Sequence, residues 1–286
     1  MTNSRKWIWV IFWCLLASGV LIFAGCGKPR FPKAPIKPVN EFSLGTAKFK
    51  PFVRRPTAQE LFDRTLEFYD SFSSAAVSWR QSEHHFGAQP IEPSGAVEGI
   101  KEKTGTASVE LRYVKPDKLL YKRDGDSPLT EVINGSVHLF YVPEQEICFR
   151  SRPGARNKIP SHLLARYLDL VPGDGREYSS LQLLRETKVG SADVYLLEAK
   201  LPSKVAGTRT LPAEVRRFYI GKSDLLLRRT EIKEIADGVS TGASENRRTY
   251  QFLGFIANSL LSDDLFPTEC PKNIRVATMP SSGLPR

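Results

Sequence analysis

Cys26 is the side chain whose surroundings in the sequence point most directly to a reaction. It follows an uncharged apolar run over residues 7–24 and the small residues Ala24 and Gly25. Small residues let an extended backbone enter a peptidase cleft, and the thiol after them can be alkylated by a diacylglycerol group. Two cations precede the run, as they do in segments that direct a chain across a membrane. The sequence therefore predicts a signal peptide over residues 1–25 and a lipid on Cys26, with an uncleaved membrane anchor as the alternative.

Two further cysteines, Cys148 and Cys270, lie in the part of the chain that is expected to fold after export. Exported compartments permit disulfides, and two cysteines allow a single pairing. Each residue could equally be a buried thiol, because a free cysteine packs as a small apolar side chain. The sequence leaves both interpretations open.

The remaining polar residues offer little chemistry. His84 and His85 are adjacent on a predicted strand, so their side chains point to opposite faces and cannot hold one metal ion together. Glu83 shares a face with His85, but a metal site needs more ligands. Asp263 and Asp264 lie in a loop and are expected to be solvated. The sequence also lacks the HExxH, CxxC, SxxK, Walker A and GxGxxG motifs, and we expect no enzyme, no cofactor and no metal site.

The positive charge of the chain is concentrated near its N-terminus. The formal net charge is +10, and residues 27–56 hold eight basic residues, one acidic residue and six prolines. Proline restricts the backbone, so we expect residues 26–56 to form an extended tether whose cations lie against anionic lipid head groups. A merely solvated linker is the alternative, and nucleic acid is not an expected partner of an exported chain.

Two helices are predicted. Thr57 and Glu60 have the spacing of a capping box, and apolar residues then recur at helical spacing as far as Phe72. A second helical segment runs from Ser161 to about Leu170 and ends before a Val-Pro-Gly sequence. The apolar side of this second segment consists of Leu163, Leu164, Tyr167 and Leu168.

Most of the remaining chain alternates between apolar runs and turn residues. The predicted strands cover residues 75–86, 104–114, 118–123, 129–133, 136–142, 146–150, 180–189, 193–201, 213–220, 225–235 and 246–256. Consecutive hairpins, with Asn134-Gly135 as the strongest turn signal, indicate an antiparallel sheet. The fold class is therefore α+β and mainly antiparallel β, a curved half-open β-barrel that helices cover on its concave face. It would occupy residues 57–271, followed by a flexible tail over 272–286.

Two resemblances add to these patterns. The residues before Cys26 resemble the lipobox of bacterial lipoproteins, in which small residues precede an invariant Cys. The domain resembles the LolA/LolB-like family of periplasmic lipoprotein-sorting proteins, whose fold the sensor protein RseB shares. The similar features are the capped opening helix, the turn at 114–119, the hairpin at 133–143, and the final strand and exit at 250–252 and 264–267.

The resemblance implies a binding protein. Members of this family carry or sense acyl chains of lipoproteins in the concave face of the half-open barrel. Ordinary core packing is the alternative for each residue expected to face this interior. The expected lipid-facing residues are Leu111, Tyr113, Tyr121, Leu139, Tyr141, Leu196 and Phe218.

The sequence thus predicts a membrane-anchored, non-enzymatic lipoprotein that binds acyl chains or lipoproteins in envelope lipid traffic. An envelope sensor or protein-interaction module, with a protein partner and no lipid cargo, is the alternative, and a purely structural lipoprotein is a third. The expected location is the cell envelope, lipid-anchored and facing the periplasm. Residue 27 is Gly and not the Asp that tends to retain enteric lipoproteins at the inner membrane, which favours the outer membrane.

Overall fold

Most of the described chain belongs to one large sheet. The computed structural model describes residues 38–45, 49–87, 101–151, 162–206, 209–236 and 244–278. The expected signal peptide, Cys26 and the start of the tether lie outside these ranges. The two α-helices of the described residues are 13 and 5 residues long, and neither is long enough to cross a membrane.

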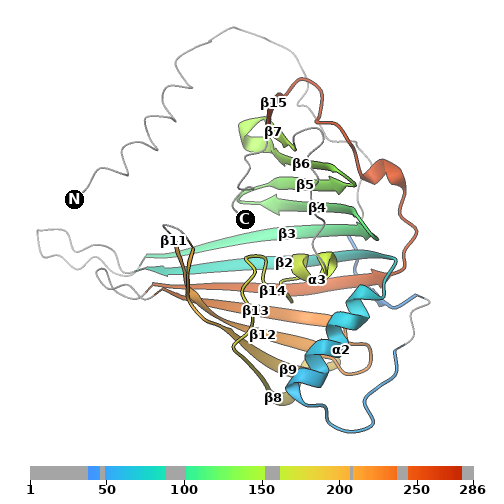
Figure 1. Ribbon diagram of the computed structural model, residues 1–286, viewed down its shortest axis with the longest axis vertical. Helices are drawn as coiled ribbons and strands as arrows, with labels where there is room; N and C mark the ends of the chain where they lie inside the picture. Colours follow the sequence, from blue (N-terminus) through green and yellow to red (C-terminus); the bar gives the residue numbers. More distant parts are fainter. Residues whose placement is uncertain are drawn as a thin grey trace, which may run out of the picture. The chain divides into compact units, whose positions relative to one another are not determined.

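The sheet contains 13 strands. Twelve of them follow one another in the order β15 (Arg275–Thr278), β7 (Ile147–Arg150), β6 (Val137–Val142), β5 (Leu129–Asn134), β4 (Lys118–Gly125), β3 (Lys101–Val114), β2 (Ser74–Gly87), β14 (Ser244–Ala257), β13 (Leu227–Ala236), β12 (Ala213–Gly221), β9 (Ala192–Leu201) and β8 (Ser180–Val189) (Figure 1). The remaining strand, β1 (Phe42–Ser43), pairs with β14. A separate hairpin joins β10 (Lys204–Ala206) to β11 (Arg209–Leu211), and short 3₁₀ turns span Pro143–Gln145 and Asp263–Leu265.

The predicted antiparallel sheet is confirmed. The strand pairings among the described residues are antiparallel except β1 with β14 and β15 with β7, which are parallel. Strands β8 and β15 stand at opposite ends of the strand order, so the sheet is open and not a closed barrel. The Asn134-Gly135 turn joins β5 to β6 as expected, with Gly135 at a φ of 59° that favours glycine.

The first predicted helix is confirmed as α2 (Ala58–Asp70). The Thr57 hydroxyl accepts a hydrogen bond from the Glu60 amide, and the Glu60 carboxylate accepts one from the Thr57 amide. These two bonds satisfy amides that have no partner in the first turn of a helix. Leu61, Phe62 and Tyr69 are buried on the apolar side of α2.

The second predicted helix is shorter than expected. α3 (Leu163–Tyr167) covers only half of the span from 161 to 170. His162 before it and Asp169 after it both adopt left-handed φ angles of 57°, which end the helical geometry on each side. No side chain caps its N-terminus.

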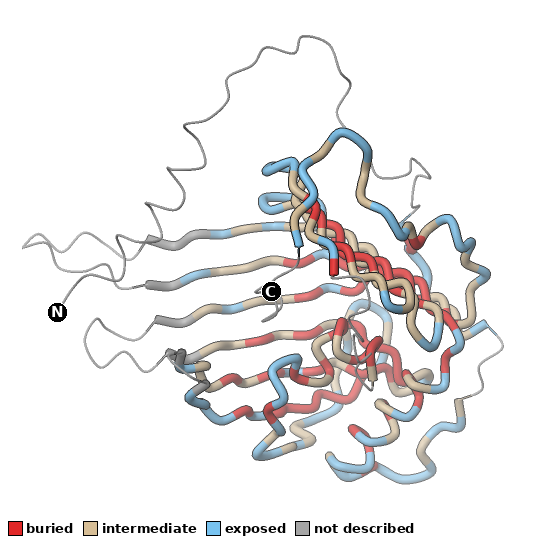
Figure 2. The backbone as a smooth tube through the Cα atoms, turned by 45° about the horizontal axis from the view of Figure 1, so that its top comes forward, coloured by how far each residue is buried: buried red, intermediate tan, exposed pale blue. Residues whose placement is uncertain are grey.

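Buried apolar residues form two clusters on opposite sides of the sheet. The inner cluster packs α2 and α3 against one side, called here the inner face, which carries Val77, Leu111 and Phe218. The outer cluster packs the segment after β14 against the other side of β4–β7. Figure 2 shows buried backbone gathering where the strands meet these helices and the segment.

The C-terminal segment is more ordered than the sequence predicts. Cys148 on β7 and Cys270 form a disulfide, with the sulfur atoms 2.09 Å apart. Phe266 is buried in the outer cluster, and its carbonyl accepts a hydrogen bond from the Asn134 side chain. The tail expected to be flexible from residue 272 instead begins with strand β15, while residues 279–286 lie outside the described residues.

Part of the expected tether also packs on the domain. Phe42 and Phe52 lie against the inner cluster, and the Arg228 guanidinium lies 3.9 Å from the Phe42 ring centroid. Val39 is buried, and its amide donates to the Ser78 hydroxyl. Apolar residues between the prolines therefore attach this stretch to the sheet, an outcome that charge and proline content alone do not indicate.

Candidate functional site

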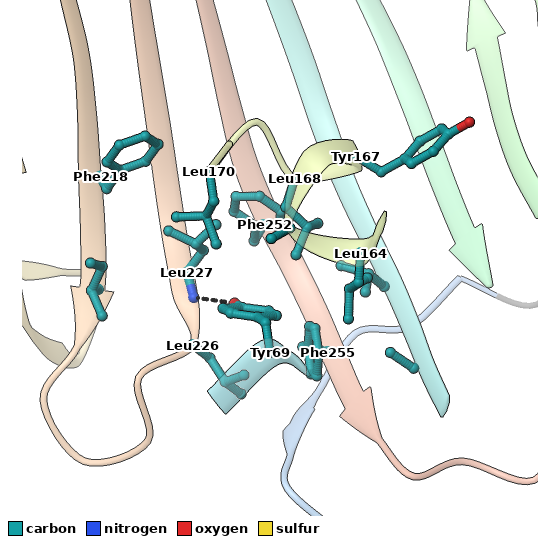
Figure 3. Packing of buried hydrophobic residues seen from close by; sticks show 14 of the residues in the cluster. Tyr69, Leu164, Tyr167, Leu168, Leu170, Phe218, Leu226, Leu227, Phe252 and Phe255 are labelled. Carbon is teal, nitrogen blue, oxygen red and sulfur yellow. Dashed lines mark hydrogen bonds between the residues drawn. The ribbon is translucent and has the colours of Figure 1, made fainter. Parts of the chain in front are cut away.

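The inner face is an apolar surface made of alternate residues from neighbouring strands. Aromatic rings line its middle, where the Trp79 ring lies 5.7 Å from Phe252 and 6.0 Å from Tyr121. From α2, the Tyr69 hydroxyl accepts a hydrogen bond from the Leu227 amide, and its ring contacts Phe255 (Figure 3). Residues of the inner cluster that are completely buried include Leu61, Phe72, Val77, Leu111, Leu119, Leu170, Phe218 and Ile232.

The seven expected lipid-facing residues do not share one face. Four belong to or pack against the inner cluster: Leu111, Tyr113, Tyr121 and Phe218. Leu139 and Tyr141 lie in the outer cluster, beside the disulfide. Leu196 lies between Tyr195 and Leu197, which are both in the inner cluster, so the two-residue period of the strand directs it to the other side. The expectation that all seven residues face one interior is therefore wrong for these last three.

Residues 162–171, called here the α3 segment, insert apolar side chains into the inner cluster. Its four leucines and Tyr167 are each at most 7 % exposed. The ring of Tyr167 lies 5.8 Å from that of Tyr121 on β4. Figure 3 shows Leu164, Leu168 and Leu170 directed toward Tyr69, Phe252 and Phe255. The large buried side chains of the segment are Leu163, Leu164, Tyr167, Leu168 and Leu170, and the smaller Ala165 is buried among them.

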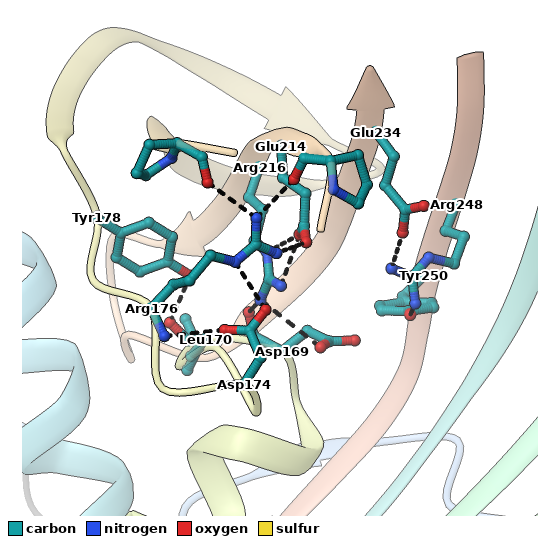
Figure 4. A network of polar contacts seen from close by, with 12 residues as sticks. Asp169, Leu170, Asp174, Arg176, Tyr178, Glu214, Arg216, Glu234, Arg248 and Tyr250 are labelled. Carbon is teal, nitrogen blue, oxygen red and sulfur yellow. Dashed lines mark hydrogen bonds and ion pairs between the residues drawn. The ribbon is translucent and has the colours of Figure 1, made fainter. Parts of the chain in front are cut away.

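Polar contacts hold the α3 segment at its two ends. At its start, the His162 ring forms an ion-pair contact with Asp70 at the end of α2. At its end, Arg216 Nη1 donates to the Asp169 carbonyl at 2.9 Å, and the Tyr178 hydroxyl donates to the Leu170 carbonyl at 2.9 Å (Figure 4). The apolar part of the segment thus lies between two polar attachment points.

The attachment at the end of the segment is a buried charged network. Arg216 donates two hydrogen bonds to one oxygen of Glu214, and Arg176 forms an ion pair with the other oxygen (Figure 4). Arg176 also donates to the carbonyls of Pro202 and Pro212. Because several donors satisfy one buried carboxylate, the network is suited to fixing the loop on β12 and not to acid–base chemistry.

Two buried polar atoms of the inner face have no hydrogen-bond partner among the described residues. They are Nε1 of Trp79 and Oγ1 of Thr230, and both side chains are at most 3 % exposed. Tyr250 links them, since it is the register partner of Thr230 and its ring lies 6.4 Å from Trp79. Burial raises the pKa of the Tyr250 phenol well above its ordinary value, so the group stays a neutral hydroxyl. The apolar face therefore contains hydrogen-bonding capacity that its own side chains do not use.

The polar residues singled out in the sequence are dispersed. His84 and His85 lie on opposite faces of β2, and His85 Nε2 is 3.7 Å from a Glu83 oxygen. Asp263 forms an exposed ion pair with Lys118. Within the described ranges, no group of three His, Cys, Asp or Glu side chains is placed to hold a metal ion.

The site residues that the sequence did not identify are Trp79, Thr230 and the Arg216 network. A lone Trp in an apolar strand carries no sequence signal for an unpaired nitrogen. The Glu214-x-Arg216 spacing does place both side chains on one face, but their burial depends on the loop that packs over them.

No family model matches the chain, and no curated protein sequence matches it. Several solved structures are similar to it at low identity. Lipoprotein LppX of Mycobacterium tuberculosis is 13 % identical, with a TM-score of 0.33 over 71 % of this chain and 97 % of that chain. A putative outer membrane lipoprotein-sorting protein domain of Vibrio parahaemolyticus is 10 % identical, with a TM-score of 0.29 over 73 % and 95 %. The complex of MucA and MucB from Pseudomonas aeruginosa is 11 % identical, with a TM-score of 0.34 over 80 % and 66 %. At these values, the function has to be argued from the residues of this chain.

Proposed function

We propose that the protein is a non-enzymatic lipoprotein of the cell envelope that binds acyl chains on its inner face. In this proposal Cys26 carries the lipid anchor, and the α3 segment is the part that moves. An acyl chain would take the place of the apolar side chains of that segment, between α2 and the sheet.

The observation that carries the proposal is the construction of the α3 segment. It is short, it lacks a capping side chain, and its five buried apolar side chains occupy the middle of the inner face. A helix of five residues has little stability of its own, so it is held there by its side chains and its two end attachments. By contrast, α2 has a capping box and 13 residues. Of the two helices, α3 is therefore the one that can leave while the sheet and α2 remain folded.

The free energy gained by burying the α3 side chains on the inner face is similar in size to the free energy gained by burying an acyl chain in their place. Burying five large apolar side chains stabilises the closed state by roughly 10 kcal/mol, at about 2 kcal/mol each. An acyl chain of about 16 carbons contributes about 12 kcal/mol when it is buried, at about 0.8 kcal/mol per CH₂. An acyl chain can therefore offset the exposure of the α3 side chains, and the unpaired Trp79 and Thr230 atoms offer hydrogen bonds to its ester group.

Tryptophan fluorescence tests the proposal at the site itself. The chain has four Trp residues, and three of them lie within residues 7–13. Because the proposed cleavage before Cys26 removes these three, Trp79 is the sole emitter of the mature protein. A phospholipid with brominated acyl chains should then quench Trp79 emission, and the unbrominated lipid should not. Absence of quenching, together with no lipid mass retained by the protein, would reject acyl binding at the inner face.

A protein-interaction module remains the second candidate, and strand β8 is the observation that favours it. β8 stands at an end of the sheet, and none of its residues is buried. Such a strand can accept a partner strand along its free side. Photo-crosslinkers at Thr187 and Gln182 should capture an envelope protein if this candidate is right, whereas crosslinks only to lipid would contradict it.

A further inference from the structure

The inner face changes from apolar to polar beyond Trp79. A groove of about 240 Å³ opens there over β2, β3 and β4. Its lining includes Gln81, Glu83, Gly105, Ala107, Arg123 and Asp126. Gln81 is buried, whereas Asp126 at the mouth of the groove is exposed.

This groove continues the surface on which an acyl chain would lie. Val109 pairs in register with Trp79 on one side and with Arg123 on the other, and both Trp79 and Val109 belong to the inner cluster. Gln81 is two residues beyond Trp79 on β2, and a strand rises about 3.3 Å per residue, so the polar groove begins roughly 7 Å from the indole. An amphiphile with its acyl chain beside Trp79 would therefore place its head group in the groove.

The groove brings one cation and two carboxylates together without pairing them to one another. Arg123 donates from Nε to the Ser127 carbonyl at 3.1 Å, and in the described part of the chain it forms no ion pair. The Asp126 carboxylate accepts from the Thr106 amide at 3.1 Å, and it too has no cationic partner among the described residues. Glu83 accepts a hydrogen bond from the Gln81 side chain, and its other oxygen lies 3.7 Å from Nε2 of His85, which also lines the groove.

The floor of the groove depends on a residue without a side chain. A Cβ atom at Gly105 would lie 3.2 Å from Oδ2 of Asp126, and Gly105 is the register partner of Glu83. Gly105 therefore leaves room between the two carboxylates, where a larger residue would fill the groove.

We propose that this groove binds the head group of a zwitterionic amphiphile, with its phosphate at Arg123 and its ammonium group at Glu83 and Asp126. This inference rests on the proposed acyl binding and specifies its ligand class. A head group with a phosphate but no ammonium would leave the Asp126 carboxylate without a cationic partner beside its negative charge, so anionic lipids are disfavoured. A phosphoethanolamine head group supplies both charges on one short chain.

The test is a competition between two lipids with the same acyl chains. The full chain, freed of lipid, is mixed with equal amounts of phosphatidylethanolamine and phosphatidylglycerol, and the lipids retained after re-isolation are quantified by mass spectrometry. We expect phosphatidylethanolamine to be preferred about fivefold, since partly exposed ion pairs contribute about 1 kcal/mol. Arg123→Gln, Asp126→Asn and Gly105→Val should each bring the ratio close to one.

Each variant has a control at a nearby residue outside the groove. Lys122→Gln and Asp124→Asn make the same charge changes at residues that pair with each other outside the groove. Thr104→Val places the same residue type on β3 next to Gly105, at an exposed position outside the groove. These three controls should keep the preference, which separates recognition in the groove from an effect of net charge or folding.

The outcomes distinguish this inference from the function on which it rests. Equal retention of both lipids, or a preference that Arg123→Gln does not change, overturns the head-group site and leaves acyl binding intact. Retention of neither lipid rejects acyl binding, and glycerophosphoethanolamine is then titrated directly. Shifts of the Gly105 and Arg123 amide resonances that Arg123→Gln abolishes would support the site for a soluble head group, and unchanged resonances would overturn it.

Discussion

Truncating a side chain of the α3 segment should tighten lipid binding while it weakens the fold. Leu168 is 1 % exposed within the inner cluster, and Leu168→Ala should lower the free energy of unfolding by about 3 kcal/mol, the usual range for a buried Leu being about 2–5 kcal/mol. If an acyl chain replaces the segment, this contact exists in the closed state and not in the bound state. The loss then lowers the free energy needed for opening.

The expected increase in lipid affinity follows from the same loss of about 3 kcal/mol. A reduction of about 3 kcal/mol in the opening free energy raises affinity by up to about 100-fold, because each 1.4 kcal/mol corresponds to a factor of ten. A residue that simply lines a binding pocket behaves in the opposite way, since its truncation removes contacts from the complex. The sign of the change therefore distinguishes a displaced segment from a permanent wall.

The assay combines Trp79 quenching by a brominated phospholipid with urea unfolding on the same samples. Leu139→Ala is the matched control, because Leu139 is completely buried but lies in the outer cluster. It should reduce stability by a similar amount and leave the lipid affinity unchanged. Weaker or unchanged binding by Leu168→Ala, with the expected loss of stability, would refute displacement of the α3 segment.

Four further outcomes are expected. Replacing Cys148 and Cys270 by Ser should lower the free energy of unfolding by up to roughly 5 kcal/mol, because the disulfide closes a loop with a sequence separation of 122. Hydrogen exchange should accelerate first in β15, and unchanged exchange in that strand would contradict this expectation. Arg216→Met should lower the free energy of unfolding by about 3 kcal/mol, since it removes a partner of the buried Glu214 carboxylate. It also removes the hydrogen bond to the Asp169 carbonyl, so the Leu170 amide should exchange its hydrogen faster. A loss of stability below about 1 kcal/mol would argue against this role of Arg216. The pKa of Glu60 lies below its ordinary value of 4.5, chiefly because the Thr57 amide donates to its carboxylate. The stabilising contribution of this carboxylate is therefore present above pH 4.5 and is lost as the pH falls through the lowered pKa. An NMR titration midpoint of Glu60 at or above 4.5 would be inconsistent with the cap. Gly254→Ala should release the stretch around Val39 from the sheet, because a Cβ atom there would clash with the Val39 carbonyl oxygen. Limited proteolysis should then cut before residue 49, whereas the wild-type cleavage pattern would contradict this expectation.

Local signals in the sequence predicted the elements that local interactions determine. The start of α2 follows from Thr57 and Glu60, which form their hydrogen bonds within one turn of chain. The β5–β6 hairpin follows from Asn134-Gly135, because Gly135 adopts the left-handed φ that this turn requires. Strands β1 and β15 could not be found in this way, since each is at most four residues long and forms by parallel pairing with a distant strand.

The choice of face was the weakest part of the prediction, for a physical reason. On β9, residues 194–199 are all buried, so both sides of the strand are covered and the two-residue period carries no polar contrast. On β6 the cause is different: Leu139 and Tyr141 alternate with partly exposed neighbours, but the C-terminal segment covers their side, which would otherwise be the solvated side of the sheet. Only the position of that segment, fixed through Cys270 and Phe266, shows which residues face α3.

The attachment of β1 to β14 also determines how far the domain can travel. If Cys26 is anchored in a bilayer, only about a dozen residues separate it from the part of the chain fixed to the sheet, and a fully extended chain of that length spans about 40 Å. The whole of residues 26–56 would have reached more than twice as far. A connection this short keeps the inner face close to the membrane that holds the anchor. The effective concentration of that membrane's lipids at the inner face is therefore high. The domain would then take up cargo only within reach of that membrane, and it could not itself carry cargo across the periplasm.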